Sequence, residues 1–199
     1  GGASKSLRLQ YKNDNLFDSL GMMYSALSSS QGGWPPLSCE GRYMGAAAWG
    51  DMNRLTNRYY SQLRDVFVFA GDGRIHLNYA LANWQRAGCV RPYTRRLEEI
   101  LGPPIPLDQM WKPDAVLRVE DISHAPITKE RVDKAAAVQL VFEDAIFHMV
   151  QHLIRSTRST RLVVTGGTAL NCLANMVLLE QFDAAWYERN LGMKDSRLH

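Results

Sequence analysis

The sequence predicts an α/β fold on three observations. The last third of the chain reads as helix, strand, Gly-Gly turn and helix, and a β-hairpin signal lies between residues 65 and 77. The composition is that of a globular domain, because 46% of the 199 residues are hydrophobic and 22% are charged. These values exclude disordered, collagen-like and coiled-coil classes, and no apolar stretch reaches the ~20 residues that a membrane span requires.

Charge and cysteine content narrow the expected partners and location. The formal net charge is +3 and lysine and arginine form no dense run, so we expect no nucleic-acid partner. Cys39, Cys89 and Cys172 are odd in number and far apart, which excludes a CxxC metal site and a disulfide framework and favours a reducing, cytoplasmic location. The N-terminal segment GGASKS has neither an initiator methionine nor a signal segment, so we expect a fragment of a longer protein.

The N-terminal part is predicted to contain two helices separated by a loop. A helix over residues 16–27, capped by Asp14 or Asn15, is predicted because apolar residues recur at helical spacing, namely Leu16, Leu20, Met23 and Leu27. Residues 28–36 are rich in serine, glycine and proline and are predicted to form a flexible loop. The small residues 46–48, which follow Glu40–Gly45, indicate a helix packed closely against a neighbour.

A hairpin and an irregular segment occupy the middle of the chain. Residues 65–69 and 75–77 flank Gly71-Asp72-Gly73, whose glycines supply the positive φ of a hairpin turn. Residues 87–127 hold six of the eight prolines and are predicted to be a connecting or inserted segment. Within that segment, residues 102–106 (GPPIP) cannot lie inside a helix.

The C-terminal third carries the strongest pattern. A helix from Ile127 to about Ser156, capped by Thr128, is predicted because one arc of it is apolar: Val132, Ala136, Leu140, Ile146, Val150 and Ile154. The β-branched segment 161–165 is predicted to be a short buried strand, and residues 169–182 to form a second helix directly after Gly166 and Gly167.

This Gly-Gly turn is the most informative candidate site. The N–H groups at a helix start lack partners within the helix and lie at the positive end of its dipole, so they suit the phosphate or ribose of a nucleotide. Asn171 lies one turn further on and adds an amide side chain. The alternative is that Gly166 and Gly167 only let the strand and helix pack closely. The pattern is neither a Walker nor a Rossmann motif, so the residues alone leave both interpretations open.

Two further groups of polar residues are candidate sites. Ser19, Glu40 and Arg42 lie near glycines and could orient sugar hydroxyls and a phosphate. From the residues alone, a surface Glu–Arg pair is the simpler interpretation.

His148 and His152 have the spacing of two metal ligands. At about 100° per residue they lie opposite the apolar arc, on the side of Lys134. This face is predicted to be solvated and no third ligand is evident, so we predict no metal site here.

No role is assigned to His76 or His124. The tryptophans are predicted to pack in the core and in loops: Trp34, Trp49, Trp84, Trp111 and Trp186.

Three segments together resemble the O-carbamoyltransferases. They are DSLGMMY at 18–24, EGRYMGAAAWG at 40–50 and LVVTGGTALNCLAN at 162–175. This family includes the nodulation proteins NodU and NolO and the tobramycin and cephamycin carbamoyltransferases. The residues around Trp34 and in 46–49 are most similar to a NolO-type nodulation protein.

The resemblance implies a fold and a domain order. Family members begin with a domain like the tRNA threonylcarbamoyl transferase protein, of the actin/Hsp70/sugar-kinase (ribonuclease H-like) superfold, and continue into a YrdC-like domain of the same polypeptide. Residues 1–199 would be a fragment of the first domain. Within it, 1–60 would hold the adenylate-proximal helix and loop, 61–126 the hairpin and proline-rich insert, and 127–199 the nucleotide-binding unit.

The resemblance also implies a reaction. The YrdC-like domain makes carbamoyl-adenylate from carbamoyl phosphate and ATP, and the first domain transfers the carbamoyl group to an acceptor hydroxyl. In the nodulation branch the acceptor is the sugar of a lipochitooligosaccharide. We expect the isolated fragment to be inactive. Strands left unpaired in a fragment would favour a homodimer.

The resemblance implies binding roles for seven residues. Gly166, Gly167 and Asn171 match the family's adenosine-binding Gly-Gly-x-Ala-x-Asn pattern, and Ser19, Gly21, Glu40 and Arg42 match the segments on the ribose and phosphate side. The family more often has lysine at the position of Arg42, and arginine differs from lysine in reach and geometry. The family's divalent metal or iron is held by a His-x-x-x-His upstream and a Gly-Asp loop downstream of the matching region, so its ligands would lie outside this chain. His148 and His152 belong to a different element.

Two other functions remain as alternatives. A sugar kinase or ATPase of the same superfold would need an N-terminal phosphate loop with a catalytic aspartate, which this sequence does not show. A non-catalytic interaction module would use the Gly-Gly turn only for packing. The catalytic base is not identified from the sequence.

Overall fold

A computed structural model describes residues 9–10, 12–33, 40–83, 94–106, 108, 126–159 and 161–191. It contains helices and one two-stranded sheet, which agrees with the predicted α/β class. In chain order the elements are η1 (Leu16–Asp18), α1 (Leu20–Gly32), α2 (Glu40–Ala47), α3 (Tyr60–Leu63), η2 (Arg64–Val66), β1 (Phe67–Phe69), β2 (Ile75–Leu77), α5 (Arg95–Leu101), α6 (Pro126–Thr157), η6 (Gly167–Leu170) and α7 (Cys172–Leu191).

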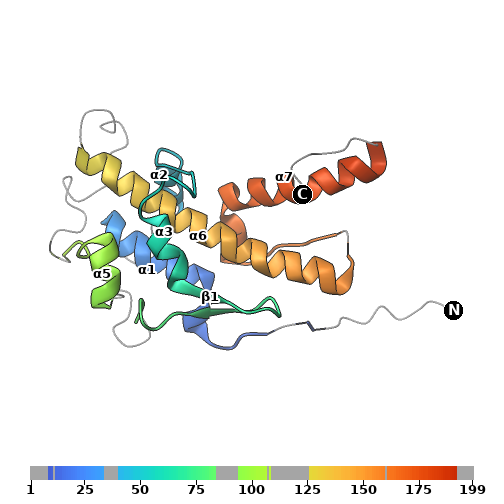
Figure 1. Ribbon diagram of the computed structural model, residues 1–199, viewed down its shortest axis with the longest axis horizontal. Helices are drawn as coiled ribbons and strands as arrows, with labels where there is room; N and C mark the ends of the chain where they lie inside the picture. Colours follow the sequence, from blue (N-terminus) through green and yellow to red (C-terminus); the bar gives the residue numbers. More distant parts are fainter. Residues whose placement is uncertain are drawn as a thin grey trace.

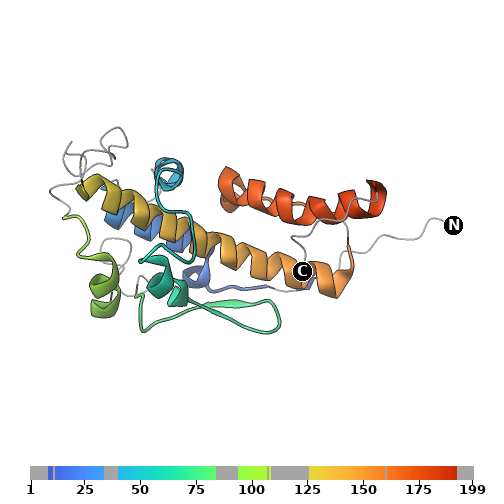
Figure 2. The ribbon, with the colours of Figure 1, turned by 45° about the horizontal axis from the view of Figure 1, so that its top comes forward.

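The long helix α6 is the centre of the molecule, and α1, α2, α3, α7 and β1 all pack against it (Figures 1 and 2). Its predicted extent and apolar arc are confirmed, because Val132, Ala136, Leu140, Ile146 and Val150 are buried. The helix begins at Pro126, two residues before the predicted cap Thr128. Proline suits the first turn because the N–H that it lacks would have had no partner there.

The face of α6 that was predicted to be solvated is covered instead. Lys134 is buried and pairs with Glu130 at 2.7 Å, and its ammonium lies 5.5 Å from the centre of the Tyr59 ring. His148 Nε2 lies 2.7 Å from the carbonyl oxygen of Ala70, and its ring packs 5.1 Å from the Phe69 ring. The hairpin and the segment before α3 therefore occupy this face, which the pattern of one helix cannot reveal.

Helix α1 is longer than predicted at its C-terminal end. Ser19, not Asp14 or Asn15, caps it by accepting from the Met22 N–H at 3.4 Å, while Asn15 caps η1. The helix continues to Gly32, so the predicted loop is wrong for residues 28–32; residues 34–36 lie outside the described part. Ser28 and Ser30 are buried, and their hydroxyls donate to carbonyl oxygens one turn earlier, which satisfies them inside the helix.

Helix α2 confirms the predicted close packing. Ala46 and Ala47 are buried whereas Ala48 is exposed, and the chain then turns at Gly50 directly against the backbone of α6. A Cβ at Gly50 would lie 2.2 Å from the carbonyl oxygen of Val132. This glycine is therefore required by space.

The predicted hairpin is confirmed as an antiparallel pair, with Phe67 opposite Leu77 and Phe69 opposite Ile75. Of the two turn glycines only Gly73 has a positive φ, at 81°.

Asp18 connects η1 to the hairpin, because its carboxylate accepts from the Leu77 N–H at 3.0 Å. His76 Nδ1 lies 3.5 Å from the same carboxylate. Burial acts to raise the pKa of Asp18, but the bonds from Leu77 and Asn13 and the neighbouring His76 outweigh it, so the pKa lies below its ordinary value.

The proline-rich segment contains one element that was not predicted. Helix α5 (Arg95–Leu101) starts at the cap Thr94, whose hydroxyl accepts from the Leu97 N–H at 3.3 Å, and it ends before Gly102. Residues 102–106 are not helical, as predicted. His124, Trp84, Trp111 and Cys89 lie outside the described residues.

The predicted buried strand 161–165 is wrong. These residues have no strand partner in the described part of the chain, and Val163 is 84% exposed. A β-branched apolar segment favours a strand, but a strand is buried only where a neighbouring strand pairs with it. The following glycines lead into the short 3₁₀ turn η6, and α7 begins at Cys172 and runs to Leu191. Within the described residues, no helix has the length and apolar content to cross a bilayer.

Candidate functional site

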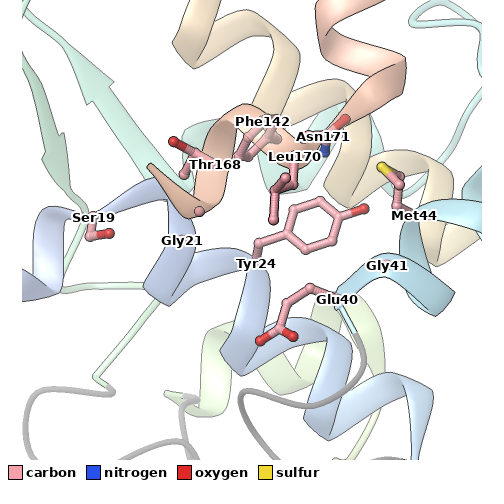
Figure 3. A pocket seen from close by; sticks show the side chains of 11 residues that line it. Ser19, Gly21, Tyr24, Glu40, Gly41, Met44, Phe142, Thr168, Leu170 and Asn171 are labelled. Atoms are coloured by element: carbon pink, nitrogen blue, oxygen red, sulfur yellow. The ribbon is translucent and has the colours of Figure 1, made fainter. Parts of the chain in front are cut away.

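A cavity of about 650 Å³ opens between the start of α1, helix α2, α6 and the η6 turn (Figure 3). This volume lies within the usual range of small-molecule sites. We call it the η6 pocket. In the described part of the chain it is lined by Ser19, Gly21, Tyr24, Glu40, Gly41, Met44, Phe142, Gly167, Thr168, Leu170 and Asn171.

The η6 pocket brings together five of the seven site residues expected from the sequence. Ser19 and Gly21 come from the start of α1, Glu40 from the start of α2, and Gly167 and Asn171 from η6 and its end (Figure 3). Arg42 and Gly166 are not among the lining residues. Arg42 is exposed, because two positions after Glu40 a helical side chain is turned by about 200°.

Gly166 shapes the turn without lining the pocket. Its φ of 90° and ψ of 177° lie in a region that is essentially restricted to glycine. This backbone bend turns the chain into η6, where the Ala169 N–H donates to the Gly166 carbonyl at 3.0 Å. The N–H groups of Gly167 and Thr168 donate no hydrogen bond to any described residue.

We expect Gly166→Ala to destabilise this turn by about 1–3 kcal/mol, because alanine rarely adopts that backbone conformation. Nothing lies within 4 Å of a Cβ at Gly166, so the loss would come from the backbone and not from a clash. Urea unfolding of the 199-residue chain measures it. Gly167→Ala is the control, because a Cβ there also meets nothing within 4 Å and its φ is not positive. Equal losses in both variants would contradict the role of Gly166.

The side chain of Asn171 forms several hydrogen bonds within the protein, which the sequence did not indicate. Its Oδ1 accepts from the Ala174 N–H at 2.9 Å, which caps α7, and its amide forms a reciprocal pair with Gln139 at 2.9 and 3.0 Å. The residue is 8% exposed and still lines the pocket. Among the described residues, one N–H of its amide has no hydrogen-bond acceptor.

The walls of the η6 pocket are largely apolar. Tyr24 packs edge-on against Tyr43 and Phe142, with ring centres 6.2 and 5.4 Å apart. Burial raises the pKa of Tyr24, and the nearby Glu143 adds to the shift, so the phenol stays neutral. Glu40 is the charged residue among the described lining residues, and none of them is cationic. Such a pocket suits an aromatic base and the hydroxyls of a sugar better than a phosphate chain.

The sequence matches the family described as carbamoyltransferase N-terminus over residues 4–189. The chain belongs to this family. It is 26% identical over 177 residues to the uncharacterized protein sll1178 of Synechocystis sp., an alignment that covers 87% of this chain and 25% of that protein. It is 39% identical over 54 residues to the nodulation protein NolO of Bradyrhizobium diazoefficiens, which covers 27% of this chain and 10% of NolO. The chain thus spans about a quarter of the length of the first relative.

Family membership confirms the resemblance drawn from the three motifs. Two of these motifs, 18–24 and 40–50, contain pocket residues that sequence reasoning did not select, namely Tyr24, Gly41 and Met44. Thr168 and Leu170 lie inside the third motif and were also missed. Phe142 carries no such signal, because within α6 it appears as one more apolar core residue.

A second hollow of about 460 Å³ lies on another side of α6, next to the hairpin and α7. Arg54 and Asp144 line it, and their side chains pair at 2.8 Å. His148 also lines it, while the half-buried His152 packs against Gly73. No group of three or more His, Cys, Asp or Glu residues suited to a metal ion occurs among the described residues.

Proposed function

We propose that this chain is part of an O-carbamoyltransferase and that its η6 pocket holds the nucleoside part of carbamoyl-adenylate. The convergence of Ser19, Gly21, Glu40, Gly167 and Asn171 on one cavity carries this proposal. These residues come from three segments that are far apart in the sequence, and each segment carries a motif of the family.

The residues of the pocket fit a nucleoside. The rings of Tyr24 and Phe142 and the side chain of Leu170 offer apolar surface to a base, and the Glu40 carboxylate can accept from ribose hydroxyls. The N–H groups of Gly167 and Thr168 are the nearest donors for the first phosphate. Any cation that neutralises further phosphates would come from outside the lining residues described here.

The whole protein would carry out carbamoyl transfer. In that step the acceptor hydroxyl oxygen bonds to the carbamoyl carbon, the bond from this carbon to a phosphate oxygen of AMP breaks, and the hydroxyl proton leaves. We propose a sugar acceptor, carbamoyl phosphate and ATP as precursors, and a YrdC-like domain of the same polypeptide as the source of the adenylate. Proximity and stabilisation of charge on the carbamoyl oxygen would supply most of the rate.

The remaining features of the family are proposed together with this reaction. The domain would have the actin-like superfold. The three parts 1–60, 61–126 and 127–199 would have the roles given above. A divalent metal or iron would be held by residues outside this chain, and the protein would be cytoplasmic. A homodimer of the isolated chain is proposed on the exposed apolar side chains of Leu162, Val163 and Val164.

Binding of ATP to the 199-residue chain, which contains the η6 pocket but not the proposed YrdC-like domain, tests the site. We expect Glu40→Ala to raise the dissociation constant for ATP about tenfold, because a hydrogen bond to a charged group is lost. Isothermal titration calorimetry measures this change. Arg42→Ala is the matched control, since it removes a charge from the same helix outside the pocket, and it should leave the constant unchanged. No binding of millimolar ATP by the unmodified protein would refute the proposed function.

A further inference from the structure

Gln139 lies on α6 behind the η6 pocket and is not among the residues that line it. Its side chain is fully buried, and its amide makes four hydrogen bonds. The Tyr24 hydroxyl and Asn171 Nδ2 donate to Gln139 Oε1 at 3.0 and 2.9 Å. Gln139 Nε2 donates to Glu143 Oε1 and to Asn171 Oδ1, both at 3.0 Å. A primary amide has two hydrogens and two acceptor positions, so all of them are used.

Two groups at the ends of this network dictate how both amides are turned. Glu143 Oε1 accepts from Gln139 Nε2, so Gln139 presents its NH₂ group to Glu143. The backbone N–H of Ala174 can only donate, so Asn171 must present Oδ1 to it. Because Gln139 and Asn171 pair head to tail, the two constraints agree, and each amide has one orientation.

Arg54 supports the acceptor end of the network. Its guanidinium lies 3.4 Å from Glu143 Oε2 and 2.8 Å from Asp144 Oδ1. Burial raises the pKa of Glu143, while the bond from Gln139 and the charge of Arg54 act in the opposite direction. The guanidinium therefore favours the carboxylate form, in which Glu143 accepts from Gln139.

We propose that Gln139 is a positioning residue that determines which hydrogen-bonding atoms Asn171 and Tyr24 present to the η6 pocket. Asn171 keeps one N–H without a partner among the described residues, and Tyr24 donates its proton to Gln139. The pocket therefore offers a donor beside an acceptor, both held within 3.0 Å of the same Gln139 oxygen. A ligand edge with an acceptor next to a donor matches this pair, as do the N7 and N6 amino group of adenine. This inference rests on the proposed nucleotide site.

Gln139→Glu tests the proposal because it changes hydrogen-bonding character with little change in shape. The new carboxylate can still accept from Tyr24 and from Asn171 Nδ2. However, a carboxylate oxygen would replace the Nε2 group that donates to Glu143 Oε1 and Asn171 Oδ1, so two acceptors would face each other at both contacts. In the 199-residue chain we expect the dissociation constant for ATP, measured by calorimetry, to rise about tenfold. Gln151→Glu makes the same change at an exposed position of α6 and should leave ATP affinity unchanged.

A double variant separates positioning from stability. Gln139→Glu combined with Glu143→Gln reverses the polarity of the pair, so the bond between positions 139 and 143 reforms and Arg54 still meets an oxygen. We expect the melting temperature to recover toward that of the unmodified protein, while ATP affinity stays about tenfold weaker, because the conflict at Asn171 remains.

The outcomes distinguish the two proposals. Unchanged ATP affinity in Gln139→Glu, or recovery of affinity together with stability in the double variant, would show that Gln139 is merely structural and would overturn the inference. Failure of the unmodified 199-residue chain to bind ATP would instead refute the proposed function, and the inference with it.

Discussion

Gly50→Ala is expected to destabilise the protein by about 3 kcal/mol or more, because the added methyl group has no space. Its Cβ would lie 2.2 Å from the carbonyl oxygen of Val132 and 2.8 Å from the Cβ of Ala136. Both neighbours belong to α6, so the clash cannot be relieved by rotating a side chain. The loop after α2 would have to move away from α6, which would also strain the bond from the Asp51 N–H to Asp133, 2.7 Å long.

Urea unfolding of the 199-residue chain measures this loss. Gly45→Ala is the matched control, because a Cβ there meets nothing within 4 Å. Gly45 lies within α2, where alanine is favoured over glycine, so we expect a gain of about 0.5–1 kcal/mol. The two variants should thus change stability in opposite directions. A Gly50→Ala chain as stable as the unmodified chain would refute the close approach of the loop and α6.

Arg54→Met is expected to cost about 2 kcal/mol at neutral pH, because it leaves the Glu143 carboxylate buried without its cation. The Glu143 side chain is 2% exposed, whereas that of Arg54 is 39% exposed, so water screens part of the interaction. Tyr60 also donates to Asp144 at 2.5 Å and would keep that carboxylate bonded. The effect would therefore fall mainly on Glu143.

The loss of stability in Arg54→Met should depend on pH. Burial raises the pKa of folded Glu143 above its unfolded value, and the opposing influence of Arg54 is only partial. A group with a raised pKa contributes stability at low pH, and this contribution is lost as pH rises through the folded pKa. Without Arg54 that pKa rises further, so the loss caused by the substitution should be larger at pH 8 than at pH 5.

Urea unfolding at the two pH values measures the difference. Arg64→Met is the control, because Arg64 lines the same second hollow but forms no ion pair with a described residue. It should change stability little at either pH. A loss in Arg54→Met that is the same at pH 5 and pH 8 would contradict the role of Glu143.

Local patterns predicted several elements correctly. The hairpin around residues 71–73 and the long helix α6 follow from periodicity and turn residues, which act over a few neighbouring positions. Local composition gave a wrong prediction where the segment is buried in the folded protein. Residues 28–30 are serines, a composition that predicts a loop, yet they lie inside α1, where the hydroxyls of Ser28 and Ser30 donate to backbone carbonyl oxygens of the helix.

The candidate site was partly predictable. Ser19, Gly21, Glu40, Gly167 and Asn171 were selected from motifs and meet in one pocket, whereas Arg42 is exposed and does not line it. Whether these residues bind a nucleotide stays a prediction. Gln139 was not selected at all, because a glutamine within an apolar arc carries no signal until its four partners are known.

The amino-acid sequence by itself determined the family, the central helix, the hairpin and most residues of the η6 pocket, since these depend on short motifs and spacing along the chain. Only the tertiary structure decided that the hairpin covers His148, that segment 161–165 is exposed, and that Gln139 connects Glu143 to Asn171. These features depend on contacts between segments distant in the chain. Burial and hydrogen-bond partners are properties of such contacts, and no single segment contains them.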